Sequence, residues 1–168
     1  IMMQPSDDQR PAYRATAAYD GTNYAGWQVQ IARPTVQGTL ETALARICQE
    51  PIRVIGAGRT DAGAHAAGQV IRFQATWRHT PGDLERALNA VLPPDVAVRA
   101  VELAPPGFHP RFSAHSRCYT YSVWAAPVRS PLRARYAHFV GQPLNLAAMN
   151  EAAAHLLGWH DFGAFGAD

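Results

Sequence analysis

Lysine is absent from this chain, in which all 15 basic residues are arginine. With 13 acidic residues the net charge is only +2, too small by itself to indicate a nucleic-acid partner. No apolar run approaches the roughly 18 residues of a membrane-spanning helix. The first eight residues, Ile1–Asp8, lack the basic end and apolar stretch of a secretory signal. We therefore expect a cytoplasmic protein without a membrane partner.

Cysteine is scarce, with only Cys48 and Cys118, which lie far apart in the sequence. We expect two reduced thiols in or near the core and not a disulfide or a metal pair. The chain also lacks a His-Glu-x-x-His motif, paired Cys-x-x-Cys motifs and a dinucleotide-binding loop. We therefore expect neither a metal nor a small-molecule cofactor.

Acidic residues are missing from the whole stretch between Glu102 and Glu151. Arginines and aromatic residues are interleaved there: Phe108, Arg111, Phe112, Arg117, Tyr119, Tyr121, Trp124, Arg129, Arg133, Arg135, Tyr136 and Phe139. Such a segment suits neutralisation of phosphates and stacking on bases. An ordinary β-region with its aromatic side chains in the core is the alternative interpretation.

The hydrophobic content of 48% and charged content of 17% indicate a globular chain. Periodicity predicts strand 12–19, helix 35–49, strands 52–58 and 68–77, a helix from Thr80 to about Pro93, and a strand from 96 to 101. Thr35 and Thr80 are the expected caps of the two helices. This order, β-α-β-β-α-β, predicts an α+β fold of the ferredoxin-like kind, an antiparallel sheet with both helices on one face.

Pro105-Pro106-Gly107 marks a boundary. Beyond it we expect strands 116–126 and 136–140 and a helix from 146 to 157, the start of a second, similar α+β unit with too few partners to close a sheet. The predicted organisation is a flexible tail (1–11), a ferredoxin-like catalytic domain (12–104) and the beginning of a truncated C-terminal domain (105–168).

One stretch stands out between the two central strands. Residues 56–68 contain four glycines, with Asp61 near the middle and Arg59 two positions before it. The flanking strands argue against a phosphate-binding loop, which would open a helix. Two interpretations are open for Asp61: a turn aspartate that accepts backbone hydrogen bonds, or a carboxylate presented for chemistry.

The motifs of the chain resemble those of the tRNA pseudouridine synthase A (TruA) family. Residues 59–66, Arg-Thr-Asp-Ala-Gly-Ala-His-Ala, match its catalytic motif without a gap. Further similar segments are 19–28, 35–41, 89–96, 111–114, 117–121 and 160–165. Two departures are His109-Pro110, where the family more often has Asp-Ala, and the end of this chain, beyond which family members continue.

The resemblance implies an isomerase that converts uridine to pseudouridine at positions 38–40 of the tRNA anticodon stem-loop, working as a homodimer. Asp61 is then the catalytic nucleophile or general base, since aspartate is ionised at neutral pH. Tyr119 would lie beside the flipped uracil, and Arg59 and Arg111 would contact the RNA. For Tyr121, core packing is the preferred interpretation, while Trp27 and Gln28 fit loop packing and substrate contact equally well. We expect His65 to be a hydrogen-bonding residue of the loop.

Two other functions are compatible with this pattern. An RRM-like, non-catalytic RNA-binding module shares the β-α-β-β-α-β order, but its third strand should carry an aromatic RNP1 motif that residues 68–74 lack. The second alternative is a folded but inactive fragment of the enzyme.

Overall fold

A computed structural model of the chain describes residues 10–165, so residues 1–9 of the predicted tail lie outside the described part. The chain divides into two compact units, and the division falls between Arg117 and Cys118. No helix among the described residues is both long and apolar enough to cross a lipid bilayer.

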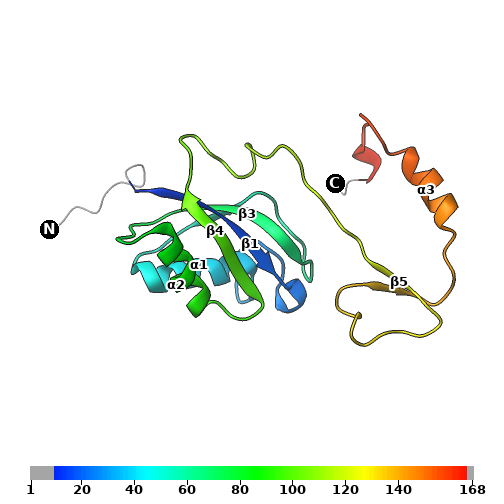
Figure 1. The fold of residues 1–168 in the computed structure, drawn as a ribbon, viewed down its shortest axis with the longest axis horizontal. Coiled ribbons are helices and arrows are strands. Elements are labelled where there is room, and N and C mark those ends of the chain that lie inside the picture. The colour runs from blue at the N-terminus through cyan, green and yellow to red at the C-terminus, as the bar shows by residue number, and fades with distance from the viewer. Residues whose placement is uncertain (1–9, 166–168) are drawn as a thin grey trace. The chain divides into compact units, whose positions relative to one another are not determined.

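The first unit is an antiparallel four-stranded sheet with two helices, an α+β arrangement (Figure 1). Its main elements are β1 (Ala12–Tyr19), α1 (Val36–Cys48), β2 (Val54–Gly56), β3 (Ala66–Gln74), α2 (Pro81–Val91) and β4 (Val96–Leu103), with a 3₁₀ turn at Gly21–Asn23. The strands lie in the order β2-β3-β1-β4, and every neighbouring pair is antiparallel. The predicted order of helices and strands is therefore confirmed, although β2 is shorter than expected.

Both helices begin where the sequence predicts. The Thr35 hydroxyl accepts a hydrogen bond from the Gly38 amide, so it caps α1. Thr80 and Asp83 form a capping box at α2, in which each side chain bonds the other residue's backbone amide. Helix α1 ends at Cys48, and the left-handed backbone of the following residue, Gln49 (φ 58°), turns the chain away from the helix axis.

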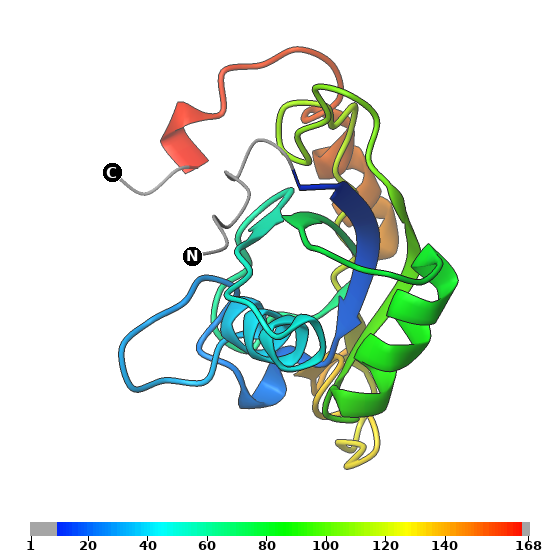
Figure 2. The same cartoon turned by 90° about the vertical axis from the view of Figure 1, so that its left-hand side faces the viewer.

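The core lies between the helices and one face of the sheet. Alternate residues of β1, namely Tyr13, Ala15, Ala17 and Tyr19, are buried there. They belong to one apolar cluster with residues of both helices, which are Val36, Leu40, Ala43, Leu44, Leu84 and Leu88. Both helices therefore cover the same face; Figure 2 shows α1, in cyan, nearly end-on.

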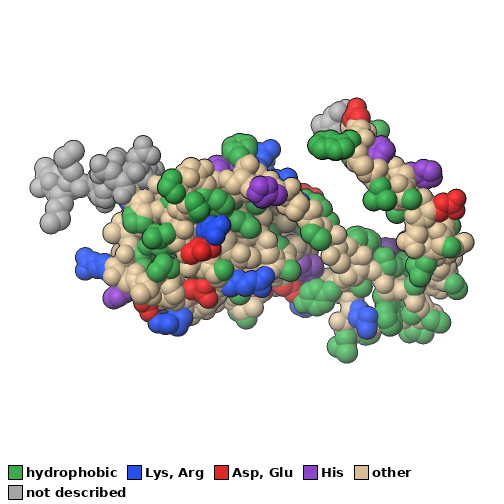
Figure 3. All heavy atoms as spheres, turned by 45° about the horizontal axis from the view of Figure 1, so that its top comes forward, with side chains coloured by type: hydrophobic (Ala, Val, Ile, Leu, Met, Phe, Trp, Pro, Cys, Tyr) green, Lys and Arg blue, Asp and Glu red, His purple; other side chains and the backbone are tan. Residues whose placement is uncertain are grey.

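The second unit is sparse. It consists of a parallel pair of three-residue strands, β5 (Val123–Ala125) and β6 (His138–Val140), followed by α3 (Leu146–Ala154) and a 3₁₀ turn at Gly163–Phe165. Among residues 118–165 no side chain is buried. Figure 3 shows hydrophobic side chains gathered on the surface of this unit. The two predicted strands and helix are present, but the predicted strand 116–126 is reduced to three residues.

Two expectations for this unit are wrong. Tyr121, expected in the core, is 79% exposed, and Cys118, expected in or near the core, is exposed. The reason is physical, because two strands of three residues cannot shield a face of side chains. Cys48 does fit the expectation: it is a free thiol packed against the core of the first unit. Burial, followed by the charge of Glu50, raises the pKa of Cys48 to about 11.

Candidate active site

Asp61 lies in the loop that joins β2 to β3, as predicted. The two strands pair up to Gly56, which lies opposite Ile71, and the chain then leaves the sheet until β3 begins at Ala66. Asp61 is exposed in this loop. Within residues 10–165 its carboxylate accepts no hydrogen bond, so the contact that the turn-stabilising interpretation requires is not present there.

The segment that follows β1 holds the Asp61 loop through the backbone. The Trp27 amide donates a hydrogen bond to the Thr60 carbonyl (2.9 Å), directly before Asp61. On the other side of Asp61, the Gly63 amide donates to the Tyr24 carbonyl (3.2 Å). Residues 20–27, which we call the cradle, therefore fix the backbone of the loop on both sides of Asp61.

Two glycines of the cradle permit this close approach. A Cβ on Gly21 would lie 2.0 Å from the Ala64 carbonyl oxygen, well inside any allowed contact. A Cβ on Gly26 would lie 2.7 Å from the Thr60 carbonyl oxygen, and Gly26 also has a φ of +95°, which L residues rarely adopt. The backbones of the cradle and the loop are thus in direct contact.

His65 closes the far end of the loop against the cradle. Its Nδ1 accepts a hydrogen bond from the Gly21 amide (3.1 Å) and lies 3.1 Å from Asp20 Oδ1. This confirms the predicted role of His65 as a loop hydrogen-bonder. The cradle is itself anchored to Asp95, which accepts a bond from the Tyr24 hydroxyl (2.7 Å). Burial, followed by the bond and charge of Asp95, raises the pKa of Tyr24 to about 12.

Two arginines lie at the loop. Arg59, which the sequence singled out, is exposed and two residues from Asp61. Arg117 reaches the loop from a distant part of the sequence, because its guanidinium donates to the Ala57 carbonyl (3.0 Å). Sequence reasoning placed Arg117 in the basic segment but did not select it as a site residue. Its sequence signals are its position in the acid-free stretch, two residues before Tyr119, and its place in the segment 117–121 that resembles the family.

Arg111 is exposed on a compact turn built around His109. The His109 Nδ1 accepts from the amides of Arg111 (3.2 Å) and Phe112 (3.4 Å), and the ring stacks on Phe112 with centroids 4.4 Å apart. Pro110 is fully buried in the first unit. The His109-Pro110 pair therefore anchors the turn that presents Arg111.

The sequence profile of the tRNA pseudouridine synthase family matches residues 15–113, more than half of the chain. The chain belongs to the tRNA pseudouridine synthase family. Similar proteins named tRNA pseudouridine synthase A occur in Geobacter sulfurreducens (48% identical over 147 residues), Moorella thermoacetica (48% over 158) and Bordetella petrii (47% over 150). These alignments cover 88%, 92% and 88% of this chain, and 60%, 64% and 56% of the relatives. The chain thus spans less than two thirds of the length of each.

The family match includes three of the four predicted site residues. Arg59, Asp61 and Arg111 all fall within residues 15–113. Tyr119 falls outside that range, in the second unit, where its side chain is 84% exposed. Its contact with a flipped base remains a prediction.

The structure assigns different surroundings to Trp27 and Gln28, for which loop packing and substrate contact fit the sequence equally well. Trp27 is only 4% exposed, and its ring lies against the backbone of Gly56, where a Cβ would come within 2.6 Å of it. Trp27 is therefore a packing residue beneath the loop. Gln28 is exposed and free to be approached from solvent.

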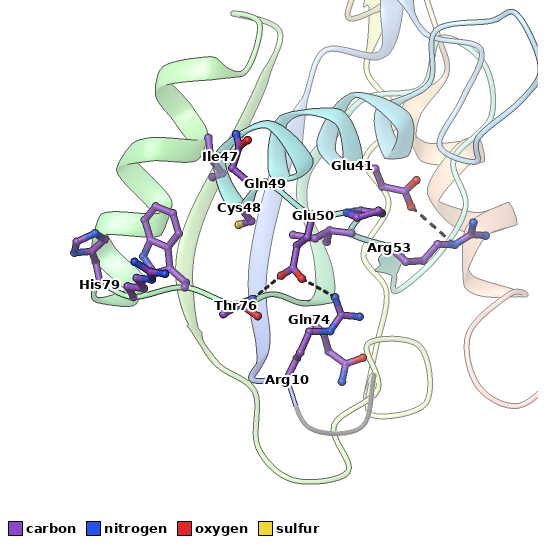
Figure 4. A pocket seen from close by; sticks show the side chains of 14 residues that line it. Arg10, Glu41, Ile47, Cys48, Gln49, Glu50, Arg53, Gln74, Thr76 and His79 are labelled. Atoms are coloured by element: carbon purple, nitrogen blue, oxygen red, sulfur yellow. Dashed lines mark hydrogen bonds and ion pairs between the residues drawn. The ribbon is translucent and has the colours of Figure 1, made fainter. Parts of the chain in front are cut away.

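A hollow of about 1140 Å³ lies at the opposite end of the sheet (Figure 4). It is lined by the end of β3 at Gln74, whereas the Asp61 loop precedes the start of that strand. Its Glu50 accepts hydrogen bonds from the Thr76 amide (2.7 Å) and from Arg10 (3.1 Å). Its two carboxylates, Glu41 and Glu50, are paired with Arg53 and Arg10, and none of the four predicted site residues lines the hollow.

Proposed function

We propose that this chain acts on tRNA as a pseudouridine synthase, with Asp61 as the catalytic residue. The observation that carries the proposal is an exposed carboxylate on a loop whose backbone is held on both sides, at Thr60 and Gly63. A reacting group must be held in a defined geometry to be effective, and this loop meets that requirement. The family membership supplies the type of reaction.

The reaction is an isomerisation of uridine. The bond between ribose C1′ and uracil N1 breaks, the base turns, and a bond forms between C1′ and C5. N1 gains a proton and the hydrogen at C5 is released to water, so the atoms balance without an oxidant or reductant. Asp61 takes part as a nucleophile or as a general base.

The target uridine must leave its stack to reach Asp61, at a cost of about a few kcal/mol. In this proposal Tyr119 receives the flipped base through ring stacking. Arg59 and Arg111 contact phosphates, for which the planar guanidinium offers paired donors. Support comes from the exposure of all three side chains.

The finer assignments belong to the same proposal. The target uridines are those at positions 38–40 of the anticodon stem-loop, the working enzyme is a homodimer, and a tRNA substrate places it in the cytoplasm. The first unit belongs to the ferredoxin-like fold, an assignment supported by its strand order β2-β3-β1-β4. A protein that reads RNA shape and phosphates tolerates differing sequences around the target.

Tritium release tests this function directly. A tRNA transcript labelled at C5 of uridine is incubated with the chain, and released tritium is counted. We expect the wild-type chain to release tritium and Asp61→Asn, which keeps the size of the side chain, to release none above background. Equal release by both proteins would exclude Asp61 as the catalytic residue.

A second candidate is a fragment that binds tRNA without modifying it. It is favoured by one observation, the lack of any buried side chain among residues 118–165. Binding of the same transcript, measured by filter retention, distinguishes the two candidates. Retention of tRNA without tritium release would support the inactive fragment and contradict the enzyme.

A further inference from the structure

Tyr19, at the end of β1, points a hydroxyl at the residue before Asp61. The side chain is only 5% exposed, and its ring packs against Trp27 with centroids 6.1 Å apart. The pairing of β1 with β3 slips in register between Ala17 and Tyr19, an irregularity of the kind that redirects a side chain. The Tyr19 hydroxyl lies 2.9 Å from Thr60 Oγ1.

Gln69, on β3, extends this contact to the other side of Arg59. Its Nε2 donates to the Gly58 carbonyl (2.6 Å). Burial raises the pKa of Tyr19, and the polar side chains of Thr60 and Gln69 partly offset this effect. Two strands of the sheet thus each bond one residue of the loop, Tyr19 of β1 at Thr60 and Gln69 of β3 at Gly58.

The hydrogen bonds of Tyr19 and Gln69 hold the loop at residues 60 and 58. Resting on the proposed function, we infer that Tyr19 and Gln69 are positioning residues, which hold Gly58 and Thr60 on either side of Arg59 and thereby set the place of Asp61. They do not touch the substrate in this proposal. A hydrogen bond between partly buried side chains is well suited to the task, because it specifies geometry as well as binding.

The consequence for catalysis is a loss of rate without a loss of tRNA binding. Displacing a reacting group by about 1 Å can cost on the order of 100-fold in rate. We therefore expect Tyr19→Phe to lower kcat for tritium release by about 10- to 100-fold. The KM for tRNA should stay within about 2-fold of wild type, because the exposed arginines are untouched.

A set of variants separates positioning from general stability. Thr60→Val removes the partner hydroxyl, and the double variant with Tyr19→Phe should lose no more activity than either single variant, since both break one contact. Thr60→Ser keeps the hydroxyl and should retain most of the activity. Tyr13→Phe is the matched control, because Tyr13 is also buried on β1 (4% exposed) but stacks on Phe73 and is distant from the loop in the strand. It should leave kcat unchanged.

Hydrogen exchange provides a readout that does not depend on activity. The amides of Trp27, Gly63 and Ala64 are hydrogen-bonded between cradle and loop or within the loop. Their exchange with deuterium should become at least about 10-fold faster in Tyr19→Phe and unchanged in Tyr13→Phe, because the loop opens more often.

The outcomes are distinct. Faster exchange together with lower kcat supports the inference. Unchanged exchange, or faster exchange with an unchanged kcat, overturns it. If the wild-type chain releases no tritium, the proposed function fails, and the exchange of the three amides alone decides whether Tyr19 holds the loop.

Discussion

At Gly21 the fit between cradle and loop leaves no room for a methyl group. The nearest atom to an added Cβ is the backbone carbonyl oxygen of Ala64, which cannot rotate away as a flexible side chain could. Gly82, in the first turn of α2, has the opposite surroundings, because a Cβ there would meet nothing nearer than the Thr80 hydroxyl at 3.9 Å. The two glycines form a natural pair for comparison.

We expect Gly21→Ala to lower the free energy of unfolding by about 1–3 kcal/mol, the usual cost of overpacking. Gly82→Ala should raise it by about 0.4–1 kcal/mol, because the unfolded chain loses freedom while the helix tolerates the methyl group. Urea unfolding followed by circular dichroism measures both. A Gly21→Ala variant as stable as wild type would show that cradle and loop are not in direct contact.

Helix α2 illustrates the scale of a single element. Its first turn is closed by the reciprocal bonds of Thr80 and Asp83, and Arg86 lies on the next turn beside Asp83. These groups lower the pKa of Asp83 below its ordinary 3.8, and the Thr80 side chain is the largest cause. The ionised carboxylate is thus favoured in the folded state.

The lowered pKa of Asp83 predicts how the stability of the protein changes in acid. Because the pKa of Asp83 is lowered by folding, its ionised form stabilises the protein at pH values above 3.8, and that stabilisation is lost as the pH falls through the folded-state value. Asp83→Asn should therefore be less stable than wild type near pH 7. The difference between the two unfolding free energies should shrink toward zero in strong acid. A difference that does not change with pH would contradict the role of the charge.

The helices and strands also show which features of the fold can be predicted from local sequence patterns. The caps at Thr35 and Thr80, the strand 12–19 and the position of the Asp61 loop follow from local spacing, and the structure confirms them. The strand expected at 116–126 fails because a strand requires a partner, and periodicity does not say whether one is present. The cradle was not predictable for the same reason, since contacts over about 40 residues leave no periodic trace.

On the scale of the whole molecule, the two units differ in how many side chains they bury. Within residues 10–117 the first unit has a core of 20 buried hydrophobic residues, whereas residues 118–165 contain no buried side chain. Segments with few buried apolar contacts open at low cost in free energy. Stability is therefore concentrated in the unit that carries Asp61.

Limited trypsin digestion tests this difference. We expect the first cuts after Arg129, Arg133 and Arg135 of the second unit, which should leave a resistant fragment that contains the whole sheet β2-β3-β1-β4. Arg53 and Arg86 are the internal controls, because their side chains are 77% and 78% exposed but lie in the first unit. Mass spectrometry identifies the cuts. Equal cleavage at the controls would contradict the prediction.

The bonds from Tyr19 to Thr60 and from Gly21 to His65 join residues 41 and 44 positions apart. During synthesis, the residues of the loop around Asp61 are therefore joined before their conformation is fixed. That conformation arises only when β1 and β3 have paired. A peptide of residues 56–68 cut from the chain, or grafted onto another scaffold, would keep the residues of the motif but lose the hydrogen bonds that fix their positions. In this protein the conformation of the Asp61 loop depends on the sheet, so we expect that the loop cannot be transplanted without it.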